Sequence, residues 1–145
     1  MPRTSDAQSR PLLLDTHVWL WLEAGSDELS PGTRGAISGA LGAGLLRIAA
    51  ISLWELALLA SHGRVVLGKP TNLWLEAALA EPGPVVEPLS ARVAIETYDL
   101  PGDFHRDPAD RMIVATARVT NAILMTRDRQ ILAYSELGHL TAIAA

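Results

Sequence analysis

The chain has 145 residues, 49% of them hydrophobic, which is the size and composition of one globular domain with a real core. It contains no cysteine, which excludes disulfides, thiolate catalysis and zinc sites built on sulfur. Its formal net charge of −4 at pH 7 argues weakly against nucleic-acid binding, because phosphate contacts usually need a basic surface.

The first ten residues, MPRTSDAQSR, are polar, and we expect residues 1–10 to form a flexible leader before a single domain over 11–145. The leader lacks the apolar stretch of a signal peptide. No apolar run in the chain approaches the roughly 18 residues of a membrane span. We therefore expect a cytoplasmic protein with no membrane association.

Short apolar runs alternate with amphipathic segments along the whole chain, as strands alternate with helices in a parallel sheet. Ser30 and Pro31 suit the start of a helix, although the glycines that follow weaken it by roughly 1 kcal/mol each relative to alanine. In chain order we expect a strand at 11–15, helices at 16–25 and 30–44, a strand at 46–52, helices at 52–63 and 71–83, an extended piece at 85–89, helices at 90–102 and 107–122, a strand at 123–126, a helix at 127–136 and a strand at 139–144. This order predicts an α/β fold with helices on both faces of a parallel sheet.

Two helix starts carry capping signals that need no further function. Ser52 and Glu55 match the S-x-x-E capping box. In the segment HRDPADR, Asp107 suits the N-cap and Pro108 the first helical position, with Asp110 in the first turn facing the helix dipole. These capping functions remain an alternative for each acid taken alone.

The predicted strands and helices place four acids at the same edge of the sheet, the edge where ligands bind in open α/β folds. Helix capping does not explain why like charges from four separate segments gather there. Two such charges a few ångströms apart repel by roughly 4 kcal/mol at an effective dielectric near 20. A bound cation removes this repulsion. The four acids are Asp15, Glu55, Asp110 and Asp128.

Carboxylate oxygens without sulfur ligands suit Mg²⁺ or Mn²⁺ better than zinc. A divalent ion held by carboxylates suits phosphoryl chemistry, because it polarises the phosphate and stabilises the leaving oxygen. The four histidines are scattered along the sequence, and only His105 falls near the acids, so we do not expect a site based on histidine.

Four segments, LLLDTHVWLW, ISLWELALLASHGRVVL, HRDPADRMIVATA and ILMTRD, together resemble PIN-domain ribonucleases of the VapC toxin type. The resemblance extends over about residues 11–145. It implies a three-layer α/β/α fold with a central, mostly parallel sheet. It also implies a metal-dependent endoribonuclease, a homodimer, which acts on RNA and is inhibited by a cognate antitoxin.

Carried over residue by residue, the resemblance makes Asp15 and Asp110 the principal ligands of Mg²⁺ or Mn²⁺. Glu55 and Asp128 would bind through water, complete a second metal site or assist the attacking water. Thr126 matches a hydroxyl that points into the site.

Three further residues of the charged segment have more than one candidate role. For Asp107 the capping role suffices. For Arg106 and Arg111, neutralising the acidic rim, meeting RNA phosphates and forming structural ion pairs remain open.

Three alternatives to a nuclease fit the sequence less well. A haloacid-dehalogenase-type phosphatase needs a second acid two residues after the strand-end Asp15, where this chain has His17. A receiver domain needs a lysine at a strand end, whereas Lys69 lies in a GKP turn. A catalytically inactive PIN-like binding module is disfavoured because all four acids are present.

Overall fold

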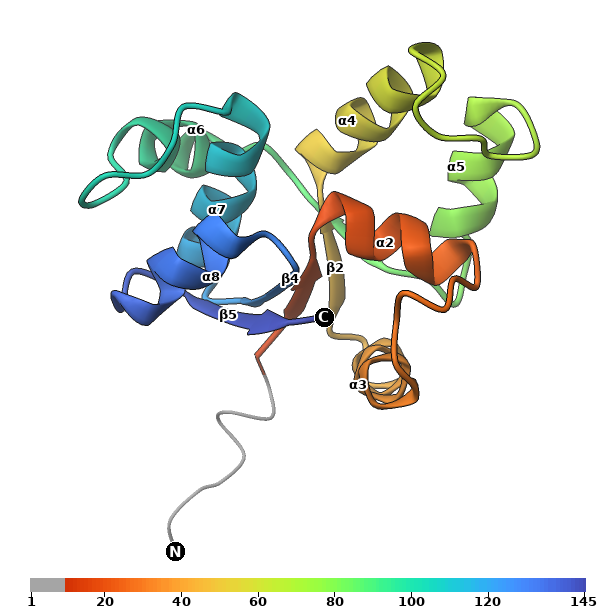
Figure 1. The fold of residues 1–145 in the computed structure, drawn as a ribbon, viewed down its shortest axis with the longest axis horizontal. Helices are drawn as coiled ribbons and strands as arrows, with labels where there is room; N and C mark the ends of the chain where they lie inside the picture. Colours follow the sequence, from red (N-terminus) through yellow and green to blue (C-terminus); the bar gives the residue numbers. More distant parts are fainter. Residues whose placement is uncertain (1–9) are drawn as a thin grey trace, which may run out of the picture.

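Five parallel strands form the central sheet of the computed structural model, which describes residues 10–145 (Figure 1). The strands lie in the order β3-β2-β1-β4-β5, and each neighbouring pair is parallel. They are β1 (Leu12–Leu14), β2 (Leu46–Ala49), β3 (Val85–Glu87), β4 (Ile123–Thr126) and β5 (Thr141–Ala144). The predicted parallel α/β sheet is thereby confirmed, and the carboxyl ends of its central strands meet at one edge.

Seven helices cover the two faces of the sheet within the described residues. Figure 1 shows α6, α7 and α8 on one side and α2, α3 and α5 on the other. The helices are α2 (Thr16–Glu23), α3 (Pro31–Gly42), α4 (Ala50–Ser61), α5 (Thr71–Leu79), α6 (Ala91–Tyr98), α7 (Pro108–Thr120) and α8 (Arg129–Glu136). The three-layer α/β/α architecture follows from this arrangement.

Alternation along β1 divides the core into two parts. Leu13 packs with Ile113, Leu124 and Ile131 against α7 and α8. Leu12 and Leu14 point to the opposite face, where they pack with the residues of α2 and α3, among them the fully buried Trp19. Because successive side chains of a strand point to opposite faces, the run LLL suits a central strand covered on both sides.

The start of α4 differs from the prediction. The helix begins at Ala50 after Ala49, and no side chain caps it, so the predicted capping box of Ser52 and Glu55 is wrong. The helix instead begins two residues earlier, because the apolar residues Ala50 and Ile51 already belong to it. Ser52 is fully buried inside the first turn, and Glu55 lies one turn further along.

Other helix starts agree more closely with the sequence. Ser30 caps α3 by accepting a hydrogen bond from the amide of Thr33, and the helix is regular in spite of its glycines. Asp107 caps α7, with Pro108 in the first turn, as predicted. Asp128, expected inside its helix, is instead the N-cap of α8.

None of the helices in residues 10–145 has the length and apolar character to cross a membrane. The predicted leader, apart from Arg10, falls outside the described residues.

Candidate active site

The four acids predicted to converge do so around one pocket of about 320 Å³ at the carboxyl edge of β1 and β4. They come from the end of β1, the second turn of α4, the first turn of α7 and the N-cap of α8. The residues lining the pocket are Asp15, His17, Val18, Trp21, Glu55, Asp107, Asp110, Arg127 and Asp128. Their convergence is confirmed, whereas their roles as metal ligands stay a prediction.

Two hydrogen bonds hold the carboxylate of Asp15, which lines this pocket. Its Oδ1 accepts from the amide of Thr16 at 2.8 Å, and its Oδ2 accepts from the hydroxyl of Thr126 at 2.6 Å. The Thr126 oxygen also accepts from the amide of Asp128 at 3.0 Å. Burial raises the pKa of Asp15, and the two hydrogen bonds oppose that rise. The buried hydroxyl of Thr126 therefore links Asp15 with Asp128, whereas its predicted role in the site stays a prediction.

Glu55 is positioned by a hydroxyl pair that the sequence analysis missed. The hydroxyl of Thr16 donates to Glu55 Oε1, and its oxygen lies 2.8 Å from the hydroxyl oxygen of the buried Ser52. Since Thr16 has one proton to give, Ser52 donates to Thr16. Burial raises the pKa of Glu55, the Thr16 hydrogen bond opposes this, and the charge of Asp15 adds to it.

Replacing Thr16 by Val is expected to lower the free energy of unfolding by about 1–3 kcal/mol, because the buried hydroxyl of Ser52 then loses its partner. Urea denaturation of Thr16→Val, Ser52→Ala and the double variant measures this in a double-mutant cycle. We expect the double variant to lose less stability than the sum of the single variants. Strictly additive losses would show that the two hydroxyls do not act as a pair.

Asp110 lies among like charges at the start of α7. Burial is the largest cause that raises its pKa to about 7, and the charges of Asp107, Asp15 and Asp128 add to the rise, as does Glu55. Asp107 contributes this charge from its capping position, where its Oδ1 accepts from the amides of Ala109 and Asp110. A group with this pKa in a cleft is typical of a functional site.

His105 joins two of the acids, although the sequence analysis did not count it as a ligand. Its Nε2 lies 3.2 Å from Asp110 Oδ2. One atom each of His105, Asp110 and Asp128 lies within 4.8 Å of the others, a separation that one metal ion can span. The only signal in the sequence is the position of His105, two residues before the capping Asp107.

The one arginine that lines this pocket is directed away from the acids. Arg127 pairs with Glu28 Oε2 at 2.6 Å, donates to the carbonyl of Ala145 and lies over the ring of Trp21. Within the described residues, no arginine or lysine pairs with the four carboxylates, and their nearest basic neighbours are His17 and His105. Their oxygen donors fit Mg²⁺ or Mn²⁺, with His105 as an added nitrogen donor that Mn²⁺ accepts more readily than Mg²⁺ does.

Arg111 has a structural role in this geometry. Its guanidinium donates to the carbonyl of Thr97 at 2.8 and 3.1 Å and to the carbonyl of Phe104 at 3.0 Å. These bonds fasten the segment that carries His105 onto α6 and α7. Arg106 is exposed and lines a separate, apolar pocket beside Leu89 and Tyr98. Neither arginine lines the acidic pocket.

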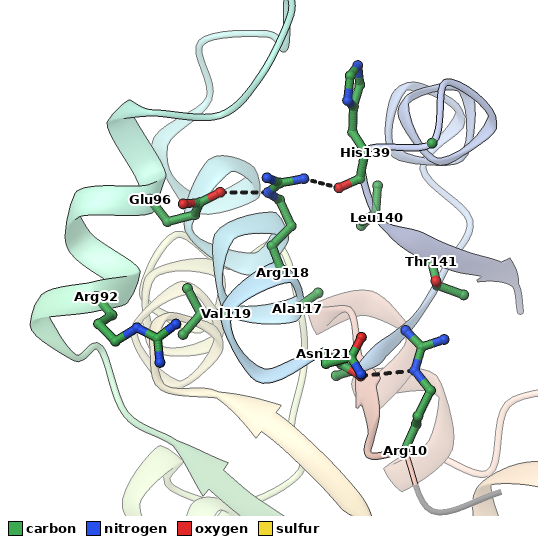
Figure 2. A pocket seen from close by; sticks show the side chains of 12 residues that line it. Arg10, Arg92, Glu96, Ala117, Arg118, Val119, Asn121, His139, Leu140 and Thr141 are labelled. Atoms are coloured by element: carbon green, nitrogen blue, oxygen red, sulfur yellow. Dashed lines mark hydrogen bonds and ion pairs between the residues drawn. The ribbon is translucent and has the colours of Figure 1, made fainter. Parts of the chain in front are cut away.

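A second pocket, of about 370 Å³, lies at the opposite edge of the sheet and is basic (Figure 2). Arg118 pairs there with Glu96 at 2.6 Å and donates to the carbonyl of His139, and Arg10 donates to the carbonyl of Asn121 at 3.0 Å. Both arginines lie near the carboxyl end of α7, where positive charge is favourable. Arg10 and Arg118 therefore stabilise the fold through these bonds, which accounts for their position in this pocket.

Replacing Arg118 by Met is expected to lower the free energy of unfolding by about 1–2 kcal/mol, because the variant loses a partly buried ion pair and a hydrogen bond to a carbonyl. The matched control is Arg92→Met, an exposed arginine lining the same pocket, for which a change within about 0.5 kcal/mol is expected. Equal losses in the two variants, measured by urea denaturation, would contradict the assignment.

A family model described as PIN domain matches residues 12–137. The chain is 41% identical to "Ribonuclease VapC22" of Mycobacterium tuberculosis over 120 residues, which is 83% of this chain and 88% of that protein. Its fold is similar to a chain in DNA-bound VapBC from Salmonella typhimurium, with a TM-score of 0.67, 16% identity and coverage of 93% and 98% of the two chains. It is likewise similar to a chain in VapBC2 from Rickettsia felis bound to a promoter DNA fragment, with a TM-score of 0.66, 14% identity and coverage of 92% and 97%.

Proposed function

The chain belongs to the PIN-domain family, and on this premise we propose that it is a VapC-type endoribonuclease that hydrolyses RNA phosphodiester bonds with Mg²⁺ or Mn²⁺. One observation carries the proposal: four carboxylates from four separate segments share one pocket, and none of them is paired with an arginine or lysine of the described residues. The family match and the identity to a named ribonuclease support it.

Asp15, Asp110, Glu55 and Asp128 would hold the metal, with His105 beside them. The bound ion would polarise the scissile phosphate and stabilise the leaving oxygen. Glu55 is suited to accept a proton from the attacking water, because burial raises its pKa and the Thr16 hydroxyl fixes one of its oxygens. Thr126 keeps Asp15 turned toward the pocket.

The proposal extends to an antitoxin partner, since two of the similar structures are VapBC complexes, and to a homodimer. A groove of about 670 Å³ between α2 and the segment around Val66 suits a bound peptide segment. His17 and Trp21 line both this groove and the acidic pocket, so a segment bound in the groove would reach the acids. A PIN-like module without catalysis would have no need of all four carboxylates.

Calorimetric titration of Mn²⁺ into the purified chain, freed of antitoxin, tests the metal site without knowledge of the RNA target. We expect saturable binding that is lost on replacing Asp15 by Asn. The same preparation is then incubated with total RNA and Mn²⁺ or with chelator, and new RNA ends are mapped by sequencing. The proposal fails if no metal binds at millimolar concentration or if the chelator leaves the new ends unchanged.

A further inference from the structure

We propose that a cleft beside the acidic pocket binds one base of the RNA strand next to the cleaved bond, with guanine as the preferred base. This base cleft of about 230 Å³ is lined by Asp103, Phe104, His105, Gln130, Ala133, Tyr134 and Leu137. The inference rests on the proposed ribonuclease function and adds a specificity determinant to it.

The base cleft adjoins the candidate metal ligands on two sides. His105 forms part of its wall, and the Nε2 of the same ring lies 3.2 Å from Asp110 Oδ2. Gln130 lies on the other side, and its backbone amide donates to Asp128 Oδ1 at 2.8 Å. Asp110 and Asp128 would hold the metal ion of the proposed ribonuclease, so a phosphate bound to that ion would place the neighbouring base at the mouth of this cleft.

The walls of the cleft suit a flat aromatic ligand. The ring of Phe104 contacts the rings of His105 and Tyr134, with centroid separations of 4.4 and 4.9 Å. Tyr134 is buried and its hydroxyl donates to the carbonyl of Pro101, so it supports the half-buried ring of Phe104 from behind. Leu137 is 71% exposed, so an apolar surface remains open to a ligand. Unstacked RNA bases bind in this way, between aromatic and apolar side chains.

Two polar side chains at the rim of the cleft account for the expected preference for guanine. Asp103 and Gln130 are exposed, and within residues 10–145 neither side chain takes part in an ion pair or a side-chain hydrogen bond. An ionised carboxylate only accepts hydrogen bonds. Guanine offers it two adjacent donors, N1–H and the N2 amino group, and its O6 can accept from the Gln130 amide. A carboxylate near RNA repels phosphates unless it binds such donors, which favours base reading as the role of Asp103.

Titration with nucleotides, followed by NMR, tests the cleft directly and without cleavage. Guanosine 5′-monophosphate is added to the full chain with Mg²⁺ present, and adenosine 5′-monophosphate serves for comparison. We expect shifts at the amides of Gln130, Ala133 and Leu137 and about tenfold tighter binding of the guanine nucleotide. Asp103→Asn should remove this preference. Asp99→Asn, which removes an exposed charge outside the cleft, should keep it.

Shifts located elsewhere, or a preference that survives in Asp103→Asn, would overturn the proposal. Mapping of RNA ends separates its failure from that of the proposed function. We expect guanine to be enriched at one position beside the cut in the wild type and in Asp99→Asn, and this enrichment to disappear in Asp103→Asn. Cleavage with an unchanged base pattern would refute the base cleft alone. Absence of metal-dependent cleavage would refute the ribonuclease function and the base cleft with it.

Discussion

Replacing Asp110 by Asn is expected to abolish RNA cleavage and at the same time to stabilise the metal-free protein. Asp110 has a pKa of about 7 because it is partly buried and lies among other acids, so its ionised form is unfavourable in the folded state. Asparagine keeps the shape and removes the charge. At pH 8 we expect the free energy of unfolding to rise by about 1–3 kcal/mol, while cleavage falls at least about 100-fold.

The sign of the stability change distinguishes a metal ligand from a simple helix-terminal acid. An acid that only faces the positive end of a helix stabilises it, and its loss would cost about 0.3–1 kcal/mol. Urea denaturation with chelator present measures the change, and Glu76→Gln, which removes an exposed charge in the middle of α5, is the control with no gain expected. A destabilised Asp110→Asn variant with normal cleavage would show that Asp110 only stabilises the start of α7 as a first-turn acid.

Bound metal should make the wild type more stable than Asp110→Asn, which is the reverse of the order expected without metal. A ligand that binds only the folded state stabilises it in proportion to the logarithm of its concentration above Kd. Added Mn²⁺ is therefore expected to raise the melting temperature of the wild type and to leave that of Asp110→Asn unchanged. An equal rise of the melting temperature in both proteins would mean that Mn²⁺ binds at a site without Asp110.

The parts of the site that follow strand ends could be predicted from the sequence. Asp15 comes directly after a run of three leucines, and Asp128 follows the strand that ends at Thr126, so the parallel sheet fixes their common edge. Asp110 follows a Pro in a helix start, which fixed its place within one turn. Local pattern and topology were sufficient for these three acids.

The missed features depend on contacts between distant segments. The S-x-x-E pattern at Ser52 occurs inside helices as well as at their starts, and here the apolar residues before it extend the helix. The pairing of Thr16 with Ser52 joins residues 36 positions apart in the chain. His105 reaches Asp110 because Arg111 fastens its loop through backbone carbonyls, which carry no mark in the sequence.

The stability of the metal-free wild type is expected to fall as the pH rises from about 4 to about 7. The folded state holds the proton of Asp110 up to a pKa of about 7, whereas the unfolded chain releases it near the ordinary value of 3.8. Between these values the folded state binds more protons, so the free energy of unfolding decreases with pH. Burial raises the pKa values of Asp15 and Glu55 as well, which adds to the decrease.

One proton corresponds to about 1.4 kcal/mol per pH unit, and we expect a total loss of about 2–4 kcal/mol across the window. Urea denaturation at half-unit steps from pH 4 to pH 8 measures this, with chelator in every sample. In Asp110→Asn the free energy of unfolding should fall less over the same pH range, because asparagine has no proton to release. The difference between the two curves gives the contribution of the Asp110 carboxyl. A wild-type curve that rises over the same window would mean that the folded protein stabilises the ionised carboxylates by itself, and the argument for a metal as their missing counter-charge would then fail.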